Sequence, residues 1–219
     1  MFKGTGKKTS ELRELPPFTK IYLQDNVNVF IRQGSVQEVK VEGGEKLIPL
    51  VKMKVDTGVL FISDDNKCNW ARSYKKGVLN VYLTMPELRF IWHYGSGNIT
   101  GIDTIFCDTL NIQTRESGDV DLTLNSGIIY NQLHGSSDVT IRGKSPLMGV
   151  YHRGEGYLHA EEMYTDEIWT YSEASGNEYL NVKNSIGAKI EWEGNIFYRG
   201  SPPNINASIK GNGKLIPIN

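Results

Sequence analysis

Apolar and polar positions alternate with a period of two along most of the chain. The alternation is strict in residues 110–115, and the same inward and outward positions return at 129–134, 148–153 and 168–173. This pattern is typical of β-strands that bury one face. Residues from 18 onward alternate in the same way, so the sequence predicts an all-β protein built from many short strands.

A short glycine-rich phrase separates these strands and recurs six times. Its third residue falls at positions 97, 118, 137, 156, 176 and 194. The copies are therefore 21, 19, 19, 20 and 18 residues apart, a regular period that indicates a stacked repeat. So short a period leaves no room for a crossover helix between parallel strands. The sequence predicts a parallel β-helix, or β-solenoid, of about 20 residues per coil, right-handed by the general preference of parallel connections.

The residues at these corners are expected to form turns. Glycine permits a positive φ, and Ser, Asn and Asp side chains satisfy the backbone groups of a corner. The corner residues that recur are Gly97, Asn98, Gly118, Asp119, Asp138, Gly156, Gly176, Asn177, Gly194 and Asn195.

Two corners depart from the phrase. Tyr157 replaces the usual Asn or Asp, and Glu178 takes a position where an inward aliphatic residue is expected, so we expect a bulge at Glu178. Residues Glu161–Trp169 have some helical character, but their place in the repeat predicts a strand and a loop.

The chain divides into four parts by pattern. Residues 1–17 are expected to form a tail, residues 18–88 a β-rich N-terminal part of the same domain, residues 89–200 the regular β-helix repeats, and residues 201–219 a closing strand. The N-terminal part forms either irregular first coils or a small sheet that caps the stack, because an open solenoid end exposes an unpaired edge. Within it, Ser63–Lys76 reads as a polar loop.

Composition narrows the classes of function. The chain has 219 residues, 24 basic and 25 acidic, with a net charge of -1, so nothing favours nucleic acid as a partner. No apolar run approaches the roughly 18 residues that a membrane span needs. The first residues lack the apolar core of a signal peptide, so we expect any export segment to have been removed. Cys68 and Cys107 are expected to be buried or partly buried thiols.

Candidate catalytic groups are few. Asp119, Asp121 and Asp138 could meet on one side of the stack with Arg142 nearby, as in enzymes that cleave polysaccharides, but turn formation explains Asp119 and Asp138 better. Of the four histidines, His93 and His152 fall in inward columns and His134 and His159 in outward ones. They do not converge, so neither a metal nor a cofactor is expected.

The strongest candidate for function is an outward surface. The strands that precede the corners place aromatic and basic side chains in outward columns, where they would form a flat ladder suited to sugar rings or to a protein partner. Cross-strand packing or coverage by the N-terminal half would explain the same residues without a ligand. The candidate ligand-binding residues are Trp92, Tyr94, Arg115, Tyr130, Tyr151, Arg153, Trp169 and Tyr171.

The corner phrase resembles that of a known family. Its copies at Gly95–Ile99, Glu116–Val120 and Gly135–Val139, with the closing segment Gly194–Pro202, are similar to the bacterial putative auto-transporter adhesin, head GIN domain family. The resemblance implies a right-handed parallel β-helix related in shape to pectin lyases, export to the bacterial surface or beyond, and a role in adhesion without catalytic residues.

We therefore expect a non-catalytic cell-surface or secreted bacterial protein that binds carbohydrate or a host or cell-surface protein through an extended β-helix face. The alternative is a polysaccharide-degrading enzyme that uses acidic residues on the β-helix surface.

Overall fold

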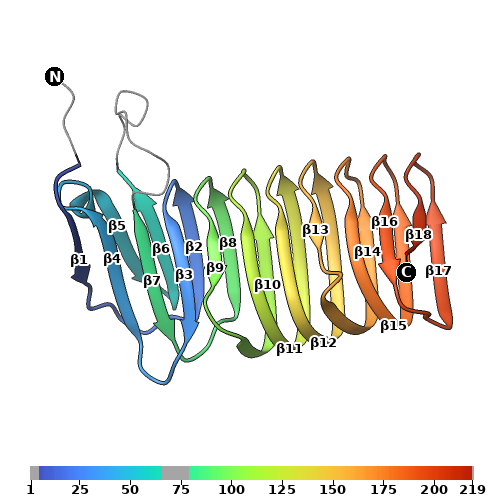
Figure 1. Ribbon diagram of the computed structural model, residues 1–219, viewed down its shortest axis with the longest axis horizontal. Coiled ribbons are helices and arrows are strands. Elements are labelled where there is room, and N and C mark those ends of the chain that lie inside the picture. The colour runs from blue at the N-terminus through green and yellow to red at the C-terminus, as the bar shows by residue number, and fades with distance from the viewer. Residues whose placement is uncertain (1–4, 66–78, 219) are drawn as a thin grey trace.

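The computed structural model describes residues 5–65 and 79–218, and it shows a stack of β-coils along one long axis (Figure 1). The described residues contain a single three-residue 3₁₀ turn, η1 (Ile48–Leu50), and are otherwise strands and turns. The strands are β1 (Lys8–Leu12), β2 (Lys20–Asp25), β3 (Asn28–Gln33), β4 (Glu38–Gly44), β5 (Val51–Asp56), β6 (Val59–Asp64), β7 (Asn80–Met85), β8 (Phe90–Gly95), β9 (Ile99–Gly101), β10 (Ile105–Thr114), β11 (Val120–Gly135), β12 (Val139–Gly154), β13 (Leu158–His159), β14 (Met163–Ser172), β15 (Glu178–Ile190), β16 (Ile196–Arg199), β17 (Asn204–Ile209) and β18 (Leu215–Pro217).

Each coil contributes one segment to each of two rows of parallel strands. In the first row, Val120 pairs with Val139, Val139 with Leu158, and Leu158 with Glu178. The second row contains β2, β8, β10, the second halves of β11, β12 and β15, and the strands β14 and β17. The partners lie about one sequence repeat apart, so the predicted parallel β-solenoid and its spacing are confirmed.

The inward side chains form one hydrophobic core that extends from coil to coil. Burial is complete or nearly so in every regular coil, because each inward residue is covered by its counterparts above and below as well as by the opposite row. Burying such a side chain contributes about 1.5 to 3 kcal/mol. The core of the regular coils includes Ile99, Leu110, Ile112, Val120, Leu122, Ile129, Val139, Ile141, Val150, Leu158, Ile168, Leu180, Ile186 and Ile196.

The glycines at the third position of the corner phrase are needed for close stacking and not for a positive φ. A Cβ on Gly156 would collide with the backbone carbonyl of Ser137, and one on Gly176 with that of Gly156. Neither Gly156 nor Gly176 has a positive φ. Other glycines of the described chain do, among them Gly135 with φ of 81° and Gly143 with φ of 109°. The expectation that corner glycine serves a left-handed conformation is therefore wrong for the third position of the phrase, and it holds at Gly135, the first residue of one copy.

Asn and Asp side chains join successive corners into a ladder. The Oδ1 atom of each accepts a hydrogen bond from the backbone N–H at the same position one coil later. The bonds run from Asp119 N to Asn98 (3.2 Å), Asp138 N to Asp119 (3.0 Å), Tyr157 N to Asp138 (2.8 Å), Asn195 N to Asn177 (2.8 Å) and Lys214 N to Asn195 (3.0 Å). Tyr157 has no such acceptor, so the ladder is interrupted at the coil that departs from the phrase.

The N-terminal end of the stack is closed by β4, β5, β6 and β7, which follow β2 and β3 in sequence but lie outside them in the stack. β6 and β7 pair in parallel with β2 and β3 on the side opposite to β8 and β9, so they form an earlier coil in space although they follow in sequence. β4 and β5 pair with this coil in antiparallel fashion, and β1 pairs with β4. The N-terminal half therefore contains both an irregular coil and an antiparallel cap.

Two local expectations need correction. Residues 8–12 form β1 and not a tail: backbone pairing with β4 orders a segment whose side chains are all exposed, which hydrophobic alternation cannot reveal. Glu178 forms no bulge, because it pairs in regular register with Leu158 and Ile196, and the irregularity lies between Thr165 and Glu167 instead.

Other expectations are met where the structure describes them. Residues 163–172 form strand β14 rather than a helix. Cys107 is a half-buried free thiol, and burial raises the pKa of that thiol. Cys68 and most of the loop expected at Ser63–Lys76 lie outside the described residues. No helix among the described residues is long and apolar enough to cross a membrane.

Candidate functional site

The eight candidate ligand-binding residues all lie on the outward side of the second strand row. We call this surface the aromatic face. Pairing places Trp92 opposite Gln113, Gln132 opposite Tyr151, and Tyr151 opposite Tyr171, so the columns run along the solenoid axis. All eight are exposed or half-exposed, so the N-terminal half does not cover them.

Many rings on the aromatic face stack on one another. The ring centroids of Phe90 and Trp92 lie 3.8 Å apart, and those of Tyr151 and Tyr171 lie 5.5 Å apart, with interplanar angles of 17° and 29°. Rings stacked in this way each cover one face of the other, so those faces are closed to a ligand. The face is therefore not the flat ladder that the outward columns suggested, but two aromatic clusters separated by a more polar zone. One cluster contains Phe90, Trp92 and Tyr94, and the other contains Tyr151 and Tyr171.

One column of the aromatic face alternates aromatic residues with glycine. Tyr130 is paired with Gly149, Gly149 with Trp169, and Trp169 with Gly187. Each ring leans over the glycine of the next coil: a Cβ on Gly149 would lie 2.9 Å from a carbon of Tyr130, and one on Gly187 would lie 3.2 Å from a carbon of Trp169. Because glycine provides no partner to stack on, these rings stay open to solvent, at 41% exposed for Tyr130 and 61% for Trp169.

A shallow pocket of about 460 Å³ lies beside Trp169 over Gly187. The residues that line it include the aromatic Tyr151, Trp169 and Tyr171 and the polar Lys189, Asn206 and Ser208. The pattern of aromatic residues did not identify Lys189, Asn206 and Ser208. The register could have done so, since Tyr171, Lys189 and Ser208 belong to one column.

The Tyr171 side chain is held in place by charged neighbours. Its hydroxyl donates a hydrogen bond of 2.8 Å to Glu173, whose other oxygen accepts one of 3.2 Å from the Tyr151 hydroxyl. The hydrogen bond from Tyr171 is the main reason that the pKa of Glu173 lies below its usual value. The same bond is the main reason that the pKa of Tyr171 lies above its usual value. The Lys189 ammonium lies 4.4 Å from the centre of the Tyr171 ring. These contacts fix the edge of the pocket before any ligand arrives.

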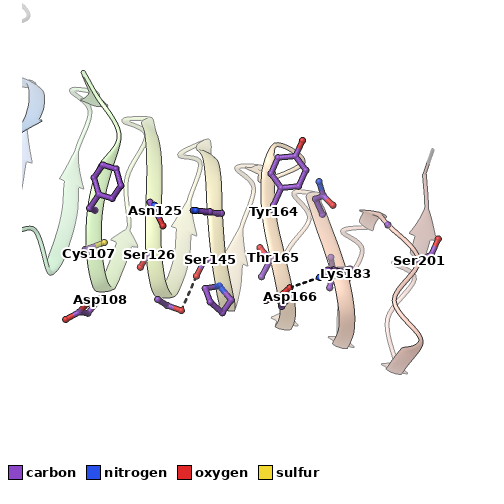
Figure 2. Close-up of a pocket in the computed structure, with 17 residues that line it drawn as sticks. Cys107, Asp108, Asn125, Ser126, Ser145, Tyr164, Thr165, Asp166, Lys183 and Ser201 are labelled. Atoms are coloured by element: carbon purple, nitrogen blue, oxygen red, sulfur yellow. Dashed lines mark hydrogen bonds and ion pairs between the residues drawn. The ribbon is translucent and has the colours of Figure 1, made fainter.

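A second and larger concavity follows the corner between the two strand rows (Figure 2). This corner groove has a volume of about 1140 Å³ and extends from Phe106 past Tyr164 to Ser201. Its buried hydroxyls already bond to the protein: Ser126 donates to the carbonyl of Ile128 (2.8 Å), and Ser145 to that of Leu147 (2.9 Å). The alternation of apolar and polar residues does not reveal the groove, although a recurring Ser or Thr between the two strands of a coil is a signal for it.

The acidic residues considered for catalysis are committed to structural contacts. Asp119 and Asp138 accept the backbone bonds of the corner ladder, and Asp121 forms an ion pair with Arg142, which also lies 3.4 Å from Glu162. Within residues 5–65 and 79–218, no group of three or more His, Cys, Asp or Glu side chains could hold a metal ion.

The histidines divide as the columns predict, and one of them affects stability. His93 and His152 are fully buried, while His134 and His159 are half-exposed. Nε2 of His93 lies 2.6 Å from the carbonyl oxygen of Gly97, which can only accept, so Nε2 carries a proton. Nδ1 has no partner, and burial lowers the pKa of His93 below 6.5.

We expect the protein to lose stability as the pH falls below about 6.5. The unfolded chain binds a proton at His93 there, whereas the folded chain resists it, so acid favours unfolding. Thermal unfolding should give a lower midpoint at about pH 5 than at about pH 7.5, and His93→Leu should reduce that difference. An unchanged difference in the variant would show that His93 is not responsible.

Comparisons with known proteins agree with this architecture. A family model described as "Putative auto-transporter adhesin, head GIN domain" matches residues 17–202. A crystal structure of a putative adhesin from Bacteroides fragilis is similar with a TM-score of 0.90, 24% identity and 97% of each chain covered. A putative adhesin and a putative lipid binding protein, both from Parabacteroides distasonis, give TM-scores of 0.75 and 0.71 at 18% and 17% identity; 99% of this chain is covered in both, and 99% and 98% of theirs. No curated protein matches the chain.

Proposed function

This chain belongs to the putative auto-transporter adhesin, head GIN domain family, and from that premise we propose that it is a non-catalytic bacterial surface or secreted module that binds carbohydrate through its aromatic face. The family description supports adhesion and a place outside the cell. The geometry of the aromatic face supports carbohydrate as the ligand.

The observation that carries this proposal is the open ring of Trp169 over Gly187. Sugar rings present apolar C–H groups on their faces and hydroxyls around their edges, so they bind where an aromatic face is bordered by hydrogen-bonding groups. Tyr151, Trp169 and Tyr171 supply the aromatic lining, and Lys189, Asn206 and Ser208 supply the polar groups. Tyr151 and Tyr171 each have one face covered by the other, so Trp169, whose ring has no stacking partner among the described residues, is the main anchor.

Retention on a panel of immobilised glycans tests the proposal. The wild-type protein should be retained by at least one glycan, and Trp169→Ala should weaken that binding by about tenfold or more, as expected for an aromatic anchor. Matched controls exist elsewhere on the surface: Trp192 is 57% exposed at a corner, and Tyr164 is 71% exposed in the corner groove. Trp192→Ala and Tyr164→Ala should leave binding unchanged.

Several outcomes would contradict the proposal. Binding that survived Trp169→Ala combined with Tyr171→Ala would place the ligand elsewhere, and loss with Tyr164→Ala would place it in the corner groove. Retention by proteins but by no glycan would favour a protein partner. Release of shorter sugar products from the panel would support the enzyme reading instead.

A further inference from the structure

The zone between the two aromatic clusters is polar and has an unbalanced charge. It comprises the outward positions of β10 from Thr109 onward and of the second halves of β11 and β12, together with Arg115, which directly follows β10. None of these outward positions is Asp or Glu. They are Thr109, Asn111, Gln113, Arg115, Ile128, Tyr130, Gln132, His134, Leu147, Gly149 and Arg153, while Tyr151 on β12 belongs to the aromatic cluster with Tyr171. The exposed residues Phe106 and Asp108 precede the zone in β10 and line the corner groove.

Basic side chains form a row along one border of this zone. His134 is paired with Arg153, and Arg115 lies beside His134 because the preceding residues Thr114 and Leu133 are paired. The guanidinium of Arg115 lies 4.9 Å from the centre of the Tyr94 ring and has no carboxylate within ion-pair distance among the described residues. The side chain of Arg153 is 65% exposed, with its Nε 3.7 Å from Glu173.

The row creates a positive potential that the rest of the zone does not cancel. The effect of this potential is seen at His134. Burial is the main cause that lowers the pKa of His134, and the positive charges of Arg115 and Arg153 lower it further. An anionic group that bound between the two arginines would relieve this repulsion.

Three amide side chains next to the row have unused hydrogen-bonding capacity. The side chains of Asn111, Gln113 and Gln132 are half-exposed and make no hydrogen bond to any other described residue. Each amide offers two N–H donors and one carbonyl acceptor. Such groups can bind both the hydroxyls and the carboxylates of a sugar.

The basic row and the open rings share one spacing. Arg115 and Arg153 are two strands apart, and so are Tyr130 and Trp169, which gives about 9.5 Å in each case from a strand separation of about 4.8 Å. A polymer that extends along the solenoid axis can repeat its contacts at this interval. A polymer that runs parallel to the strands would meet the row only once.

From these observations we propose that the carbohydrate is an acidic polysaccharide, which lies along the solenoid axis in the strip between Tyr130 and Trp169 on one side and the basic row on the other, columns about 13 Å apart, with its anionic groups directed towards Arg115 and Arg153. This inference rests on the proposed function and specifies its ligand class. The unpaired amides bind the hydroxyls between the charged groups.

A matched pair of polymers tests the charge requirement. Polygalacturonate and alginate are each compared with the same polymer after its carboxyl groups have been reduced to alcohols, so that the backbone is kept and the charge is lost. At least one acidic polymer should bind about tenfold or more tightly than its reduced form. The difference should shrink at high salt, because screening weakens exposed charge pairs.

Variants locate the charge requirement on the protein. Arg115→Gln combined with Arg153→Gln should remove the preference for the acidic polymer, while Arg142→Gln combined with Arg199→Gln, on the first strand row, should keep it. Thermal unfolding of both double variants checks that they fold, as expected for substitutions at exposed positions.

The outcomes separate this inference from the proposed function. If acidic and reduced polymers bind equally and Trp169→Ala weakens both, carbohydrate binding stands and the acidic ligand is wrong. A preference for the acidic polymer that survives loss of both arginines also overturns the inference. If neither form of any polymer binds, and the wider glycan panel gives no retention either, the proposed function itself fails.

Discussion

Replacing His152 with leucine is expected to lower the free energy of unfolding by about 3 to 5 kcal/mol. His152 and Glu178 are both fully buried, with Nδ1 of the histidine 3.4 Å from Oε1 of the glutamate. The other carboxylate oxygen accepts a hydrogen bond of 2.7 Å from the Thr170 hydroxyl. Without His152, that hydroxyl is the one polar partner that the described part of the chain offers to the buried Glu178 side chain. The thermal midpoint should fall by about 6 to 20 °C.

Replacing the other partner, Glu178→Leu, should lower the free energy of unfolding by less, about 1 to 3 kcal/mol. His152 would keep its contact of 3.0 Å from Nε2 to the Gly156 carbonyl. It would then resemble His93, which contacts the Gly97 carbonyl through Nε2 and already has an unpartnered Nδ1. The fold therefore tolerates a buried histidine in this state. Among the described residues Glu178 is the one Asp or Glu that is fully buried, so no second example shows that the fold tolerates such a residue without its partner.

The double variant tests whether the pair is coupled. Replacing both His152 and Glu178 with leucine should bring stability back towards the wild type, because the neighbours of Glu178 in its column, Leu158 and Ile196, are apolar. Denaturant unfolding of the wild type, both single variants and the double variant measures the coupling. Losses that simply add would show that the two side chains do not interact.

The sequence was sufficient to predict the stack because its signals are local and repeated. Alternation of period two identifies the inward side of each strand, and the spacing of the corners then brings each strand beside its counterpart one coil later. Thus Leu110, Ile112 and Ile129 could be assigned to the core before any coordinates were known, and the structure buries all three. The eight residues of the aromatic face likewise follow from alternation alone.

Features that depend on contacts between distant segments were beyond the same reasoning. β7 joins β3 across a separation of about 50 residues, with Asn28 opposite Asn80, and no repeat phrase marks that pairing. The direction of each outward ring depends on what occupies the next coil. Trp169 stays open and Tyr151 stacks because their respective neighbours are Gly187 and Tyr171, so residue type at one position does not decide exposure.

Gly176→Ala should be among the most damaging single substitutions in the stack. A Cβ at this position would collide with the carbonyl of Gly156 and approach that of Glu155 to 2.7 Å. Both obstacles are backbone atoms fixed by the parallel ladder, so relief requires neighbouring coils to separate. We expect a loss of about 3 kcal/mol, at the upper end of the usual cost of overpacking, and a midpoint lower by about 6 to 12 °C.

Gly101→Ala is the matched control for this substitution. The nearest atom to a Cβ on Gly101 is a methyl carbon of Leu122 at 3.2 Å, which can move slightly, so the midpoint should change little. Ser137 shows why a side chain at a corner is not ruled out in itself: its hydroxyl donates a hydrogen bond of 2.9 Å to the Glu116 carbonyl. Alanine cannot form such a bond. If Gly176→Ala unfolded at the same temperature as Gly101→Ala, close stacking would not be the reason for glycine at these corners, and the spacing between coils would have to be more adaptable than the structure indicates.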